Sequence, residues 1–138
     1  MENLAIAAAE RPAIYMSAVE CDALFELALS AERSQPMVCS MLMAELERAE
    51  LRDADALPDQ TVVMNAFIDF VDERTGARRF VQLVYPHDAD ISDGRISILT
   101  PVGAGLIGMT AGCSIRWPDR SGEDHVLRII RVTPPDKG

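Results

Sequence analysis

The 138-residue sequence is poor in the residues that most metal centres and many catalytic sites require. It has two histidines, His87 and His125, and three cysteines, none of them in a metal-type spacing. A zinc centre or a histidine-based catalytic site is therefore not expected. An odd number of cysteines also gives no disulfide framework, which favours a reducing compartment and predicts a cytoplasmic protein.

Long apolar runs are absent too, since no stretch approaches the roughly 18 residues that a membrane span requires. The first residues lack the basic region of a secretory signal, so neither an anchor nor a leader is predicted. Aromatic residues make up only 5% of the chain, and no nucleic-acid-binding motif occurs. What remains, 49% hydrophobic and 25% charged residues, is typical of one globular domain.

Basic residues are scarce in one half of the chain. Residues 1–60 carry a net charge of −8 and residues 61–138 a net charge of −1. The acidic half is expected to repel nucleic-acid phosphates and to suit a basic partner surface. The alternative, that these charges only keep a small helical region in solution, stays open at this point.

Helical periodicity marks two segments, at about residues 20–33 and 37–52. In each, small and apolar side chains recur at spacings of 3, 4 and 3, which predicts one buried face. The positions are Cys21, Leu24, Ala28 and Ala31, and then Cys39, Leu42, Leu46 and Ala49. Phe25 and Leu29 are expected to widen the first face. Ser17, with Glu20 three residues later, has the spacing of a capping box.

The connection between these helices, residues 32–36, is short enough to require antiparallel neighbours. Helices of about 14–16 residues span roughly 21–24 Å. We therefore predict a short acidic helical hairpin, a coiled coil, over residues 17–53.

From residue 60 onward the hydrophobic period becomes that of strands. Strands are predicted at residues 61–71, 79–85, 95–99, 114–117 and 126–132, with a hairpin turn at 72–76. Thr100 and Pro101 suit a helix N-cap and first helical position, which predicts a short helix over residues 102–107. Arg128 and Arg131, three apart, are expected on opposite sides of the last strand. The predicted fold is α+β, with a mostly antiparallel sheet and one small helix over residues 60–134.

Gly103, Gly105 and Gly108 have the spacing of a dinucleotide fingerprint, but the flanking segments are too short for a βαβ unit. These glycines are instead predicted to allow close packing of the helix on the sheet and to end the helix. His87 and His125 are interpreted as solvated residues. We predict no catalytic residue, no metal site and no cofactor, and hence an interaction protein rather than an enzyme.

Several segments, in order, resemble the Rnk family, the regulators of nucleoside diphosphate kinase, which belong with the bacterial Gre transcript-cleavage factors. They are residues 43–49, 57–58, 62–65, 83–86 and 96–108. The resemblance implies a short N-terminal coiled coil and a C-terminal FKBP-like α+β domain. It also implies RNA polymerase as the partner, with the globular domain docked at the rim of the secondary channel and the coiled coil inserted.

The resemblance also implies two sets of site residues. Thr100 and Pro101 match the Ser-Pro of the Gre docking loop, which places the polymerase contact at Leu99, Thr100, Pro101 and Val102. Gre factors often have an acid where Leu99 stands. At the hairpin tip a Gre factor presents paired acids that help to hold a catalytic magnesium. The tip here, Glu32, Arg33, Ser34 and Gln35, offers a single carboxylate.

We therefore expect a monomeric, non-enzymatic regulator that binds RNA polymerase at the secondary channel, can compete there with Gre factors and does not stimulate transcript cleavage. One alternative is a small FKBP-like peptidyl-prolyl isomerase, which would need an apolar pocket around Trp117. Another is an oligomerising module that uses the methionines of the second helix, Met37, Met41 and Met43.

Overall fold

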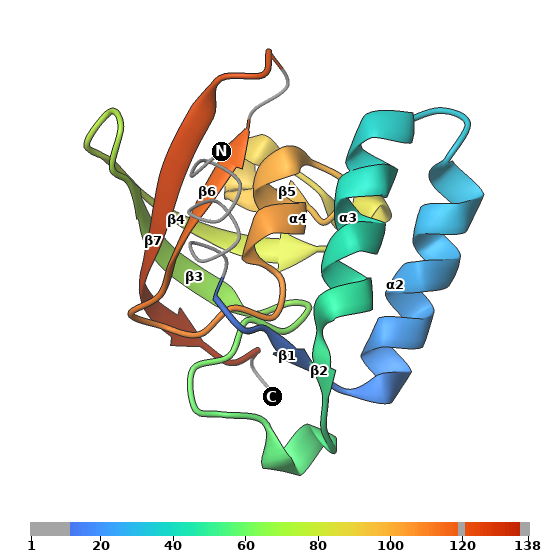
Figure 1. Cartoon of the computed structure of the whole chain (residues 1–138). Helices are drawn as coiled ribbons and strands as arrows, with labels where there is room; N and C mark the ends of the chain where they lie inside the picture. The colour runs from blue at the N-terminus through green and yellow to red at the C-terminus, as the bar shows by residue number, and fades with distance from the viewer. Residues whose placement is uncertain (1–11, 119–120, 136–138) are drawn as a thin grey trace, which may run out of the picture.

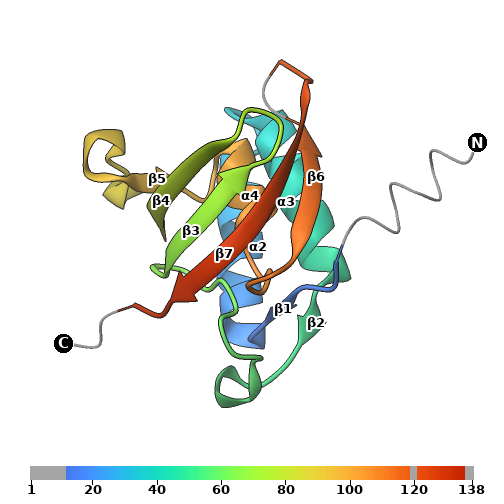
Figure 2. The same ribbon diagram turned by 90° about the vertical axis from the view of Figure 1, so that its left-hand side faces the viewer.

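The computed structural model describes residues 12–118 and 121–135. Within them the chain has an α+β fold, in which the helices α2, α3 and α4 lie on one side of a five-stranded sheet (Figures 1 and 2). This arrangement confirms the predicted α+β fold class. None of the helices in these two ranges has the length and apolar character needed to cross a membrane.

The predicted helical hairpin consists of α2 (Ala18–Ala31) and α3 (Pro36–Arg48). The hydroxyl of Ser17 caps α2, as predicted, by accepting a hydrogen bond from the Glu20 N–H at 3.1 Å. The Glu20 carboxylate accepts a hydrogen bond from the Met64 N–H, also at 3.1 Å, and not from the Ser17 N–H as the predicted capping box requires. This side chain therefore joins the start of α2 to the sheet half of the chain.

The prediction that the second helix continues to residue 52 is wrong. Helix α3 ends at Arg48, and the next residues form β2 (Glu50–Leu51), which pairs in parallel with β1 (Tyr15–Met16). The Glu50 N–H donates to the Ile14 carbonyl at 2.9 Å. Pairing with a strand more than thirty residues away thus replaces the last turn of the helix.

The predicted buried face of the hairpin is largely confirmed. Leu24 and Ala28 of α2 and Cys39, Leu42 and Leu46 of α3 are buried, whereas Cys21, Ala31 and Ala49 are half-buried. Phe25 and Leu29 do not widen this face, because both are exposed. One residue step turns an α-helix by about 100°, so Phe25 points well away from the direction of Leu24.

The main sheet has the strand order β5-β4-β3-β7-β6. Its strands are β3 (Phe67–Asp72), β4 (Ala77–Val84), β5 (Arg95–Ser97), β6 (Ser114–Pro118) and β7 (Asp124–Thr133). Within this sheet, as residues 12–118 and 121–135 form it, the β4–β5 pair is parallel and the other three pairs are antiparallel. Helix α4 (Pro101–Leu106) follows β5, and short 3₁₀ turns occupy Ala54–Ala56, Pro86–Asp88 and Ile91–Asp93.

The strand predicted from residue 61 starts only at Phe67. Asn65 has a φ of 72°, in the left-handed region, so the chain turns there and cannot continue as a strand. Before this turn, the Val62 N–H donates to the Met109 carbonyl, and the Val62 carbonyl accepts from the Gly108 N–H. Val62 therefore pairs with the loop after α4 and not with a strand of the main sheet.

The expectation that Arg128 and Arg131 face opposite sides of β7 is also wrong. The β3–β7 register pairs Asp69 with Arg131 but Phe70 with Ile129, so that one residue of β7 has no partner. This irregularity is a β-bulge, which shifts the alternation of side chains by one position. Both arginines therefore lie on the outer face of the sheet, which the helices leave open (Figure 2).

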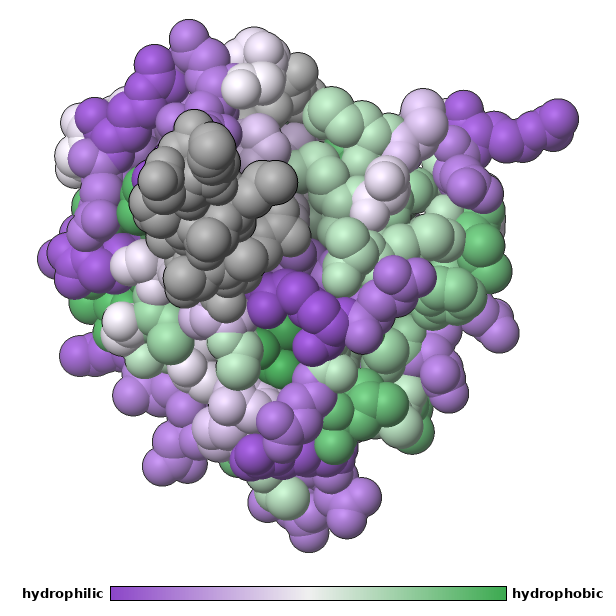
Figure 3. Space-filling view, in the orientation of Figure 1, coloured by the Kyte–Doolittle hydropathy of each residue, from purple (hydrophilic) through white to green (hydrophobic). Residues whose placement is uncertain are grey.

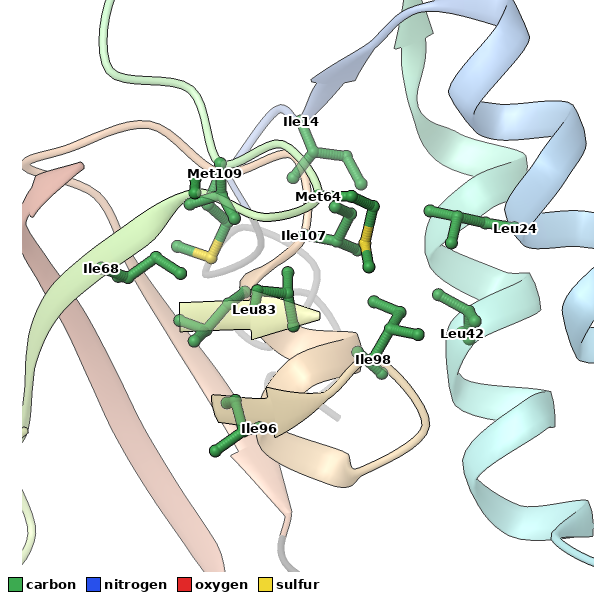
Figure 4. Packing of buried hydrophobic residues seen from close by; sticks show 14 of the residues in the cluster. Ile14, Leu24, Leu42, Met64, Ile68, Leu83, Ile96, Ile98, Ile107 and Met109 are labelled. Carbon is green, nitrogen blue, oxygen red and sulfur yellow. The ribbon is translucent and has the colours of Figure 1, made fainter. Parts of the chain in front are cut away.

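The helical hairpin and the sheet share one hydrophobic core. Figure 4 shows Leu24 and Leu42 of the hairpin pointing toward Ile98 and Met64 from the sheet half, and all four belong to a single buried cluster. A buried leucine contributes about 1.5–3 kcal/mol through the hydrophobic effect. The hairpin is therefore packed along the body of the molecule, beside α4 (Figure 1).

Candidate functional site

The predicted docking loop is the connection from β5 into α4, and it is fixed by local hydrogen bonds. The Thr100 hydroxyl donates to the Ser97 carbonyl at 2.7 Å and accepts from the Gly103 N–H at 3.1 Å. Thr100 is thus the N-cap of α4 and Pro101 its first residue, as the sequence predicts. The side chain of Leu99 belongs to the core, so the accessible part of this loop is formed by Thr100 and Val102.

The glycines of α4 have a packing role. A Cβ added at Gly103 would lie 2.3 Å from the Ser97 carbonyl oxygen, and one at Gly105 would lie 2.9 Å from the Trp117 ring. Gly108 ends the segment with a φ of 81°. The prediction of close helix–sheet packing is confirmed. Glycine here lets α4 lie almost in contact with β5 and β6, next to the predicted docking loop.

A cavity of about 350 Å³ opens beside the docking loop. Pro101 and Val102 form one wall, and the rings of Phe70 and Trp117 contribute apolar surface from the sheet. The Arg79 guanidinium, which also lines the cavity, lies 5.9 Å from the centre of the Phe70 ring. The combination of an apolar interior and a few charged groups suits an apolar side chain of a binding partner.

A histidine–aspartate pair, which sequence reasoning missed, also lines this cavity. The Nδ1 atom of His125 lies 2.6 Å from Oδ2 of Asp72, and both side chains are mostly buried. The other oxygen of Asp72 accepts from the Arg74 N–H in the β3–β4 turn. The interpretation of His125 as a solvated residue is therefore wrong. No local pattern reveals the pair, because the residues are 53 positions apart and meet only through the β3–β7 register.

The predicted tip of the hairpin joins α2 to α3 at the top of Figure 1. Glu32, Arg33 and Ser34 are exposed and Gln35 is half-buried. The backbone is held by hydrogen bonds from the Ser34 and Gln35 N–H groups to the Ala31 carbonyl. In residues 12–118 and 121–135, no three His, Cys, Asp or Glu side chains are grouped so that they could hold a metal ion.

The comparisons with known proteins agree with this geometry. The family model described as "Transcription elongation factor, GreA/GreB, C-term" matches residues 57–134, which include the sheet, α4 and the docking loop. The chain belongs to the GreA/GreB family. The match covers all the segments in which the sequence resemblance was found except residues 43–49, and the relation to the Gre factors is confirmed.

Individual relatives of this GreA/GreB family member extend the likeness to the hairpin. It is 31% identical to the regulator of nucleoside diphosphate kinase of Escherichia coli (strain K12) over 122 residues, which are 88% of this chain and 90% of the relative. It is 33% identical to the transcription elongation factor GreA of Acidiphilium cryptum, covering 89% and 83% of the two chains. The resemblance to the Rnk family is confirmed.

A solved structure supports the fold of this family member. The prokaryotic transcription elongation factor GreA/GreB from Nitrosomonas europaea superposes with a TM-score of 0.69 at 37% sequence identity. The similarity covers 89% of this chain and 99% of that one. Both the hairpin and the sheet half therefore have counterparts in a Gre protein of similar length.

Replacing Glu20 with glutamine is expected to raise the melting temperature of this family member by a few degrees at neutral pH. Burial raises the pKa of Glu20, and the hydrogen bond from Met64 lowers it by less. The folded state therefore holds the proton more tightly than the unfolded state. The stability that this group contributes is complete below the ordinary glutamate pKa and is lost as the pH rises through the raised pKa. Glutamine keeps an acceptor for Met64 without a charge to bury.

Thermal melts of both proteins from about pH 4 to about pH 8 test this expectation, since the difference should shrink toward acid. Glu26→Gln, an exposed position on the same helix, is the control and should leave the melting temperature unchanged. A benefit of Glu20→Gln that is equal at all pH values would contradict the role of charge burial.

Proposed function

We propose that this chain is a cytoplasmic, monomeric regulator that binds RNA polymerase at the secondary channel and has no transcript-cleavage or other enzymatic activity. The observation that carries the proposal is the Gre-type C-terminal domain, in which the loop around Thr100-Pro101 leaves Thr100 and Val102 accessible. In this proposal residues 60–134 form an FKBP-like anchor at the channel rim. Residues 17–53 form a short coiled coil that is directed into the channel, where it competes with Gre factors.

The docking loop and its cavity support the anchoring part of the proposal. Leu99 and Pro101 are buried and position the loop, while Thr100 and Val102 are accessible to a partner. An apolar polymerase side chain can enter the cavity of about 350 Å³ that Pro101 and Val102 line. The sequence has no acid at Leu99, so we propose that this contact depends mainly on apolar burial.

The residues of the tip support the proposal that this chain does not stimulate transcript cleavage. Glu32 is its one carboxylate, and Arg33 beside it carries the opposite charge. Holding a magnesium ion for phosphoryl chemistry takes more than one carboxylate. With 14 and 13 residues, α2 and α3 are also only about 20 Å long. A hairpin of this length is short for bringing an acid to a deep catalytic centre.

Val102→Asp is expected to weaken binding to core RNA polymerase about tenfold, because it places a charge on the apolar wall of the cavity. Co-elution of the full chain with core polymerase in gel filtration, followed by a titration, measures this. Ile91→Asp introduces the same charge at an exposed position outside the cavity and should bind normally. Failure of the unmodified chain to bind at low salt, or equal effects of the two substitutions, would overturn the docking proposal.

A cleavage assay on stalled elongation complexes tests separately whether this chain stimulates transcript cleavage. With a GreA protein as positive control, the transcripts should be shortened only by GreA, and this chain should reduce that shortening by competition. Robust cleavage in the presence of this chain alone would contradict the proposal.

The isomerase alternative is not favoured. The cavity next to Trp117 is the feature that it requires, and it is present. None of the three relatives described above is named as an isomerase, however. We therefore assign the cavity to partner docking.

A further inference from the structure

The α2–α3 hairpin carries apolar side chains that the fold leaves exposed. Phe25 and Leu29, one turn apart on α2, are 39% and 50% exposed, and Met37 at the start of α3 is 44% exposed. Residues four apart share one side of a helix, so Phe25 and Leu29 form a stripe. Figure 3 shows hydrophobic surface on the side of the molecule where the hairpin lies. The core of the hairpin is completed by other residues, which leaves this surface available.

Unpaired carboxylates accompany the stripe. Asp22, Glu26 and Glu32 make no ion pair within residues 12–118 and 121–135. Helix α2 contains no lysine or arginine. The single arginine of α3, Arg48, lies 2.8 Å from the buried Glu45 carboxylate. The carboxylates of the hairpin therefore outnumber its cations, and the apolar stripe lies in a net negative field that Arg33 at the tip reduces only in part.

We propose that this hairpin flank, formed by Asp22, Phe25, Glu26, Leu29 and Met37, is a docking surface for a basic amphipathic helix of a partner protein. Such a helix would place its apolar stripe on Phe25 and Leu29, and its flanking lysines or arginines would meet the carboxylates. Nucleic acids and anionic membranes are repelled by the same charges. The flank shares no residue with the tip or the docking loop, and the peptide test of this surface requires no polymerase.

A second copy of the chain fits this surface less well than a basic partner. Flank-to-flank pairing would bring the carboxylates of two hairpins together, which is unfavourable. Pairing with Arg78 or Arg128 of the sheet would have to break their present contacts. Arg78 holds Asp69 through two hydrogen bonds of 2.8 and 3.0 Å, and Arg128 contacts Glu73 at 2.6 Å. A basic partner helix avoids both costs, because its cations meet the carboxylates of only one hairpin.

A labelled peptide of leucine and lysine, about 18 residues long and with leucines at helical spacing, is the probe for this surface. Fluorescence anisotropy with the full chain should show saturable binding that weakens with salt. A peptide of the same composition with scrambled order retains the charge but loses the apolar stripe, and should bind at least about tenfold more weakly.

Leu29→Gln and Asp22→Lys should each weaken binding about five- to tenfold, by removing apolar contact and by reversing a charge. The matched controls are Ile130→Gln and Asp124→Lys, exposed positions on β7, and these should bind the peptide normally. Circular dichroism verifies that each variant is folded. Each flank variant tests the proposal on its own, so one folded flank variant is enough. The proposal is overturned by absent binding at low salt, by equal binding of the scrambled peptide, or by equal loss in the control variants. It is also overturned if sedimentation shows a dimer that Leu29→Gln dissociates, since a second copy would then occupy the flank.

Discussion

Gly103→Ala is expected to lower the free energy of unfolding by about 3 kcal/mol, a large part of the stability of a domain this size. The added Cβ would lie 2.3 Å from the Ser97 carbonyl oxygen and 3.0 Å from the Ile98 Cα. Both neighbours are backbone atoms, so the helix or the strand must shift as a whole. Because Gly103 also donates its N–H to the Thr100 hydroxyl, the shift should distort the docking loop. Urea unfolding followed by circular dichroism measures the loss.

Gly76→Ala is the matched control for this prediction. Gly76 has a φ of 78°, so alanine is strained there, but nothing lies within 4 Å of the added atom. The backbone strain alone costs about 1 kcal/mol. If Gly103→Ala costs no more than Gly76→Ala, the close approach of α4 to β5 is not as tight as the structure has it.

Leu42→Ala should cost about 3 kcal/mol as well and should lower the stability of the hairpin and the sheet together. Leu42 is fully buried and belongs to the cluster that also contains Ile98 and Met64. Removing its side chain leaves a cavity between the helical hairpin and the sheet. We expect one cooperative unfolding transition, shifted to lower denaturant concentration, whether helical circular dichroism or Trp117 fluorescence is monitored.

The control for this substitution is Leu29→Ala, which is half-exposed and should cost less than about 0.5 kcal/mol. Two separate transitions in Leu42→Ala, with the fluorescence transition unchanged, would show that the hairpin unfolds independently. The expected result, one cooperative transition, would mean that residues 17–53 and 60–134 do not unfold as independent units. Their division into two domains stays a prediction.

The parts of the fold that the sequence predicted well depend on local signals. Ser17 and Thr100 cap helices within three residues of themselves, and the glycine at position 76 turns the β3–β4 hairpin. The buried positions of α2 and α3 follow from helical spacing alone. The start of α4 follows from Thr100 and Pro101, since a cap followed by proline has few alternatives.

Several errors involve partners distant in the sequence, whereas the placement of Phe25 and Leu29 on the buried face failed within a single helix. Arg48 ends α3 because the following residues pair with β1, and the bulge in β7 appears only in its register with β3. The cavity beside Trp117 and its His125–Asp72 pair depend on the same register. Periodicity describes one segment at a time and cannot reveal which strand lies next to which.

The small β1–β2 pair has a mechanical consequence. β1 precedes α2 and β2 follows α3, so their pairing closes the base of the hairpin. The Tyr15 N–H in β1 also donates to the Gly108 carbonyl, just after α4. Backbone bonds thus connect both helical arms to the segment that carries the docking loop. A load applied at the tip is transmitted through this junction, so the arms cannot splay or swing freely, and immobilising one end of the molecule sets the orientation of the other.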